Sequence, residues 1–137
     1  MKSLACAAAL ALFAAPAFAQ DGGHTVTLNF DVGVRDGQVM VALFDSADAW
    51  RGDRSVARAA ASAAGPVVVF RDLPAGDYAV KAFHDVDGDG RMDANPFGIP
   101  TEPYAFSNNA VGNMGPASWE AARFTVSGDV AQTLRIR

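Results

Sequence analysis

The stretch Val26-Thr27-Leu28-Asn29-Phe30-Asp31-Val32-Gly33-Val34 alternates apolar and polar residues without interruption. A period of two puts every second side chain on one face, so this stretch predicts a β-strand with one buried face. Asp36-Gly37 follows, a dipeptide that tolerates the positive φ angles of a tight hairpin turn. The apolar run Val39–Phe44 then predicts the returning strand, buried on both faces or central in its sheet.

Short strand-like segments continue along the chain, separated by turns rich in Gly, Pro and Asp. They are Val67–Phe70, Tyr78–His84, Ala122–Val126 and Val130–Ile136. This spacing predicts an all-β fold, an antiparallel β-sandwich with one long Gly/Pro/Asn-rich loop. Asp45 or Ser46 is expected to cap a short helix that includes Trp50. The alanine-rich stretch Val56–Ala64 fits either a helix or a weak strand.

The N-terminus has the three parts of a secretory signal peptide. Lys2 precedes a short apolar run, and Ala17-Phe18-Ala19 supplies a small-x-small ending. The apolar run is shorter than the roughly 20 residues that span a bilayer. We therefore expect residues 1–19 to be cleaved, leaving residues 20–137 as a single periplasmic or secreted domain without a transmembrane anchor. Cys6, the one cysteine, would leave with the signal, which excludes disulfides and thiolate metal sites.

Composition excludes several classes of partner. The chain has 11 basic and 15 acidic residues, a formal net charge of -4, and its sequence shows no basic cluster. The net charge therefore gives no general attraction to nucleic acid or anionic lipid, and no nucleic-acid partner is expected. Half of the residues are hydrophobic, which argues against a disordered chain.

The segment from Asp85 to Ser118 is a long connection, and loops of this length are usually functional or held by a bound group. It begins with Asp85-Val86-Asp87-Gly88-Asp89-Gly90-Arg91-Met92-Asp93. Carboxylates at positions 1, 3, 5 and 9, with glycine at position 6, match the start of an EF-hand-type calcium loop. Position 12 is Pro96, and the preceding segment is strand-like, so an EF-hand domain is not expected.

Calcium takes six to eight oxygen ligands at about 2.3–2.6 Å, and alternate residues of a tight loop can direct their oxygens inward. We predict a structural Ca2+ site whose ligands are Asp85, Asp87, Asp89, the backbone carbonyl of Arg91, and Asp93. The remaining ligand would come from Glu102, Asn95 or water. The alternative is an acidic, solvated turn that binds no metal.

A series of segments resembles the bacterial exported family called domain of unknown function 2141. The segments are Phe70–Asp85, Asn95, Gly98-Ile99-Pro100, Glu102-Pro103-Tyr104, Phe106–Ala110 and Ala122-Arg123-Phe124. The resemblance covers essentially the whole of residues 20–137, and the GIPxEPYxFSNNA segment is its most specific part. It implies a prealbumin-like or immunoglobulin-like β-sandwich and export, and it implies no particular activity.

Candidate catalytic residues are few. His84 could act as a general base oriented by Asp85, although packing at the end of a strand is the favoured interpretation. We therefore expect a noncatalytic, calcium-stabilised domain that binds an unknown protein, glycan or small apolar ligand. One alternative is a hydrolase that uses a metal-activated water. Another is an envelope component that assembles through its edge strands.

Aromatic residues offer further candidate contacts. Trp50 and Trp119 either stack on a sugar or aromatic ligand or cover the core. Phe97, Tyr104 and Phe106 make the long loop aromatic, which predicts that it folds back as a lid over the edge of the core.

Overall fold

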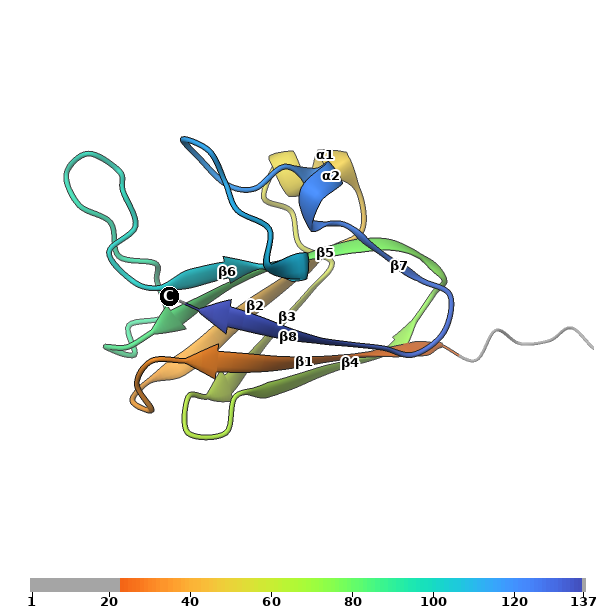
Figure 1. Ribbon diagram of the computed structural model, residues 1–137, viewed down its shortest axis with the longest axis horizontal. Helices are drawn as coiled ribbons and strands as arrows, with labels where there is room; N and C mark the ends of the chain where they lie inside the picture. The colour runs from red at the N-terminus through yellow and green to blue at the C-terminus, as the bar shows by residue number, and fades with distance from the viewer. Residues whose placement is uncertain (1–22, 137) are drawn as a thin grey trace, which may run out of the picture.

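The computed structural model describes residues 23–136, and it forms two β-sheets packed face to face (Figure 1). One sheet contains, in spatial order, β4 (Val67–Leu73), β1 (His24–Val32) and β8 (Val130–Ile136). The other contains β3 (Ala57–Ser62), β2 (Gln38–Phe44), β5 (Gly76–Asp85) and β6 (Tyr104–Phe106), with β7 (Phe124–Val126) also paired to β5. The predicted all-β sandwich is confirmed. The predicted signal peptide, with Lys2 and Cys6, lies outside the described residues.

The sandwich core is formed by the inward side chains of both sheets. Val26, Leu28 and Phe30 of β1 are all buried in it, as the alternation predicts. β2 lies between β3 and β5, so its central position is also confirmed. Within residues 23–136 no helix has the length and apolar character needed to cross a bilayer.

The predicted hairpin between the first two strands is wrong. β1 pairs antiparallel with β4 and parallel with β8, whereas β2 pairs antiparallel with β3 and β5. The Asp36-Gly37 turn, with Gly37 at φ 78°, therefore carries the chain from one sheet to the other. Alternation shows which face of a strand is buried but not which strand is its partner, and both strands bury a face in the same core.

The two uncertain segments after β2 are a helix and a strand. The predicted short helix is α1 (Ala47–Arg51), and the side chain of Ser46 caps it by accepting the amide N–H of Ala49 at 3.1 Å. The alanine-rich stretch is β3, which pairs with β2 along its whole length and alternates between half-buried and exposed residues. Pairing with β3 satisfies the backbone groups along one edge of β2, which would stay unpaired if residues 57–62 formed a helix. Tertiary context therefore overrides the helix propensity of alanine.

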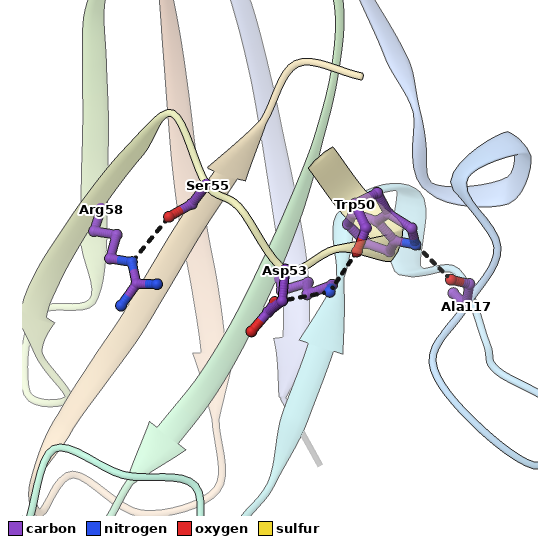
Figure 2. A network of polar contacts seen from close by, with 6 residues as sticks. Trp50, Asp53, Ser55, Arg58 and Ala117 are labelled. Atoms are coloured by element: carbon purple, nitrogen blue, oxygen red, sulfur yellow. Dashed lines mark hydrogen bonds and ion pairs between the residues drawn. The ribbon is translucent and has the colours of Figure 1, made fainter. Parts of the chain in front are cut away.

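A second apolar cluster lies on the outer face of the larger sheet, where α1 and α2 (Trp119–Ala122) cover it. Trp50 is its centre, with ring centroids 5.3 Å from Phe44, 5.8 Å from Phe106 and 6.3 Å from Trp119. The indole N–H of Trp50 donates to the carbonyl of Ala117 at 3.0 Å (Figure 2). Trp50 therefore covers a core and presents no free face for a ligand.

The segment that carries the strongest family resemblance joins the two sheets. Within the 3-10 turn η1 (Ser107–Asn109), the buried hydroxyl of Ser107 accepts the amide N–H of Val80 at 2.9 Å and donates to the carbonyl of Ala122 at 2.5 Å. The side chain of Asn109 donates to the carbonyl of Thr133 and accepts the amide N–H of Arg135. Asn109 thus occupies backbone groups of β8 that would otherwise form a free edge.

Candidate functional site

The acidic loop begins and ends at one place because β5 and β6 are antiparallel neighbours. Phe83 lies opposite Tyr104, and the amide of His84 donates to the carbonyl of Pro103 at 2.8 Å. Continuing this register brings Asp85, the last residue of β5, opposite Glu102. Sequence positions far apart along the loop are thereby brought together at its base.

Four carboxylates converge at this base, with oxygens that all lie within 4.8 Å of one another. They belong to Asp85, Asp87, Asp89 and Glu102. Asp85 and Glu102 are buried, whereas Asp87 and Asp89 are exposed. Carboxylate oxygens are hard donors of the kind that Ca2+ prefers, so the donor set fits the predicted ion.

Backbone amides hold these carboxylates in place. Asp85 accepts the amide of Gly90 at 2.7 Å and that of Asp89 at 3.2 Å. Glu102 accepts the amide of Val86 at 2.8 Å and that of Asp93 at 3.0 Å, and so ties both sides of the loop. The loop is therefore shaped around its acidic residues by its own hydrogen bonds.

The charges in the loop shift two pKa values in opposite directions. Burial alone would raise the pKa of Asp85, but hydrogen bonds from the amide of Gly90, the side chain of Asp87 and further loop amides hold that pKa below its ordinary value. The pKa of Asp93 is raised to about 6, first by its hydrogen bond with the side chain of Asp87, then by burial and the surrounding negative charges. The raised pKa of Asp93 thus reflects the uncompensated negative charge of the surrounding carboxylates.

The remaining predicted ligands have different surroundings. Asp93 lies beside the cluster, since its side chain bonds with Asp87 and its amide with Glu102, but its carboxylate is not one of the four that converge. Arg91 donates its amide to Asp89, and no contact of its carbonyl distinguishes it as a ligand. Asn95 accepts the amides of Phe97 and Ile99 with its side-chain oxygen, which is therefore used within a turn.

His84 packs at the end of the sandwich, as the favoured interpretation predicts. Its side chain is fully buried and lies on the same face of β5 as Ala82, the core side, whereas Lys81 and Phe83 lie on the other face. Nε2 lies 2.5 Å from the carbonyl oxygen of Asp36. A base for a metal-activated water must reach that water, and the buried position of His84 gives no support to the hydrolase alternative.

Next to the acidic loop, a groove of about 1070 Å³ crosses the outer face of the larger sheet. Its floor consists of outward side chains of β2, β5 and β6, among them Met40, Ala42, Lys81, Phe83 and Tyr104. Its walls come from two long connections, residues 90–100 and 112–116. Both connections rise on the side of the sheet where α1 and α2 lie (Figure 1).

The aromatic residues of the long loop do not form the predicted lid. Phe97 is 89% exposed, Tyr104 faces the groove, and Phe106 is buried in the second apolar cluster. The prediction failed because residues 104–106 form a strand, which places alternate side chains by its pairing with β5. Phe97 lies in the turn before that strand, where its amide donates to the side-chain oxygen of Asn95.

Sequence reasoning also missed the groove itself, because its residues come from separate segments. The signal present in the sequence was the alternation of β5, which puts Lys81 and Phe83 on the face opposite the sandwich core. Without the strand order, nothing in the sequence showed that Met40 of β2 lies beside Phe83.

Comparison with curated proteins and with solved structures finds no match. A bacterial family model does match the chain over residues 31–134, a range that includes the acidic loop, the groove and the η1 turn. The chain therefore belongs to the family described as an uncharacterised protein conserved in bacteria, domain of unknown function 2141.

Proposed function

We propose that this protein is an exported, noncatalytic binding domain whose acidic loop holds a structural Ca2+ ion. The observation that carries the proposal is the convergence of four carboxylates from the two ends of one loop, at a spacing that follows the DxDxDG pattern of calcium loops. The ligand site is the groove, one wall of which is formed by the same loop. Calcium would fix the loop and with it one wall of the groove.

Electrostatics supports a cation here. Asp85 and Glu102 are buried, and a buried carboxylate is stable only when it is hydrogen-bonded or paired with a positive charge. Both have amide donors, yet no Lys or Arg of the described residues forms an ion pair with either of them. A divalent ion would supply the missing positive charge and relieve the repulsion within the cluster.

Thermal unfolding of the purified protein tests the calcium proposal. At a free calcium concentration 100 times the dissociation constant, binding stabilises the folded state by about 2.7 kcal/mol. For a domain of this size the melting temperature should rise by roughly 10 °C or more, and a chelator should abolish the rise. Asp89→Ala should melt alike in both buffers, whereas Glu120→Gln, an exposed acidic residue on α2, should keep the full shift.

Identical melting curves of the unmodified protein in calcium and in chelator would contradict the proposal. In chelator, Asp89→Ala is informative as well, because removal of one charge relieves repulsion and should leave stability equal or slightly higher.

Export rests on the signal-peptide pattern of residues 1–19. The intact mass of the protein isolated from the cells that produce it tests this step. We expect a chain that begins at or near Gln20. A mass that retains residues 1–19, or a lipid on Cys6, would contradict it.

A further inference from the structure

We propose that the groove binds a single-chain amphiphile with a carboxylate headgroup, the carboxylate on Arg58 and the chain across the sheet. This inference deepens the proposed function by naming the class of ligand, and it rests on the groove being the ligand site. Three observations carry it: the apolar floor, the exposed apolar side chains on the walls, and one cation that is free to take an anion.

The floor is apolar along one line across the strands. Met40 of β2 lies opposite Phe83 of β5, and Phe83 lies opposite Tyr104 of β6. All three line the groove, and they come from three neighbouring strands of the sheet. An apolar chain laid across it would remove these side chains from water, which is favourable in proportion to the area covered.

The walls expose apolar side chains that the folded domain does not use. Phe97 is 89% exposed, Ile99 59% and Met114 104%. All three line the same groove, and they come from both of its walls. Isolated exposed apolar residues need no explanation, but a set that faces one groove marks a binding surface. Methionines are suited to such a surface because their flexible thioether side chains adapt to a ligand chain.

The two basic residues of the groove differ in what they already bind. The ammonium of Lys81 forms an ion pair with Asp53 at 3.0 Å, donates to the carbonyl of Trp50 and lies 4.7 Å from the centre of the Trp50 ring. Arg58 donates only its Nε–H, to the hydroxyl of Ser55 at 2.9 Å (Figure 2). None of the ion pairs among residues 23–136 includes Arg58.

The terminal nitrogens of Arg58 are therefore available to a carboxylate, which guanidinium binds in a bidentate manner. Arg58 lies on the same face of β3 as Ala60, two residues away, at the β3 end of the row Ala60, Met40, Phe83, Tyr104, which runs across the sheet. Three strand spacings separate the ends of that row, about 14 Å, which is long enough for a medium-length acyl chain. A headgroup on Arg58 would thus direct its chain over the apolar floor towards the walls.

Isothermal titration with decanoate at micromolar concentration, in calcium buffer, tests the inference. We expect decanoate to bind, and decyltrimethylammonium, which has the same chain and the opposite charge, to bind at least tenfold more weakly. Arg58→Gln should weaken decanoate binding about threefold to tenfold, because an exposed ionic hydrogen bond is lost. Arg71→Gln, an exposed arginine on β4 in the other sheet, should leave the affinity unchanged. Ile99→Ser should weaken both amphiphiles.

Three outcomes would overturn the inference: no binding of decanoate, equal binding of the cationic amphiphile, or equal affinity of the Arg58 and Arg71 variants. Each variant is first checked for an unchanged melting temperature, so that lost binding is not lost folding. The calcium-dependent melting shift is measured on the same samples. If the melting temperature rises with calcium but decanoate does not bind, this inference is overturned and the calcium proposal stands. If decanoate binds but calcium does not raise the melting temperature, the calcium proposal is overturned and this inference stands.

Discussion

The two halves of the outer face of the larger sheet differ in what covers them. Over one half lie α1 and α2 (Figure 1), and there Phe44 and Phe106 are buried against Trp50. Over the other half, Met40 and Phe83 stay open to a groove, under loops that extend their apolar side chains into solvent. The covered half is a second core, whereas the open half has apolar surface that contributes little to folding.

From this difference we expect the aromatic residues of the covered half to serve stability and those of the open half to serve binding. Trp50 and Phe97 are both large apolar residues of connecting segments, yet the first is 4% exposed and the second 89%. A change on the covered half should therefore alter unfolding, and a change on the open half should alter binding alone. The predictions below test this division, from the largest expected effect to the smallest.

Trp50→Ala should produce the largest loss of stability, about 3–5 kcal/mol, because it opens a cavity between Phe44 and Phe106. It also leaves the buried carbonyl of Ala117 without its donor. Denaturant unfolding measures the loss. Phe97→Ala is the matched change on the open half, and its free energy of unfolding should stay within about 0.5 kcal/mol of the unmodified protein. Equal losses in the two variants would contradict the division.

Most of the fold followed from the sequence because its strands carry a strong period of two. The alternation in Val26–Val34 identified β1 and its buried face, and the Gly/Pro-rich turns located the ends of later strands. Strand partners did not follow, because the short turns after β1 and β4 carry the chain between sheets rather than back along one sheet. Turn residues fix a change of direction, but only packing of the whole core decides which strands become neighbours.

The acidic loop was easier to predict than the groove for the same reason. Asp85, Asp87 and Asp89 are close in sequence, so their convergence depends on local turns. Glu102 joins them through the pairing of β5 with β6, a strand of three residues that sequence patterns did not reveal. The groove depends entirely on such long-range pairings, and its residues have no common spacing along the chain.

Ser107→Ala should cost about 1–3 kcal/mol, less than the loss at Trp50. The buried hydroxyl of Ser107 is the hydrogen-bond partner of both the amide of Val80 and the carbonyl of Ala122, and alanine leaves both without it. Ser127→Ala, in the exposed turn before β8, is the control and should be neutral. A neutral Ser107 variant would show that the η1 turn does not hold the covered half together.

The pH dependence of stability should reverse between chelator and calcium. In chelator, Asp93 has a pKa raised from 3.8 to about 6 in the folded state, so folding binds its proton more tightly. That contribution is present below about pH 4 and is lost as the pH rises through 6. A calcium ion on the four converging carboxylates would disfavour the nearby proton of Asp93, so calcium affinity should increase over that interval. Melting curves from pH 4 to 7 measure both trends, and Asp93→Asn should remove the trend in chelator.

Met114→Asn should have the smallest effect on stability and still change binding. Met114 is fully exposed and has φ 58°, a left-handed conformation that asparagine tolerates better than methionine does. The free energy of unfolding should therefore be unchanged or higher by a few tenths of a kcal/mol. Because the substitution removes an apolar side chain from the wall of the groove, decanoate should bind severalfold more weakly. Glycine at the same position fits the backbone and also lacks the side chain, so Met114→Gly should match Met114→Asn in binding. An unchanged affinity in both variants would show that this wall does not contact the ligand, and a large loss of stability in both would show that the open half also supports the fold.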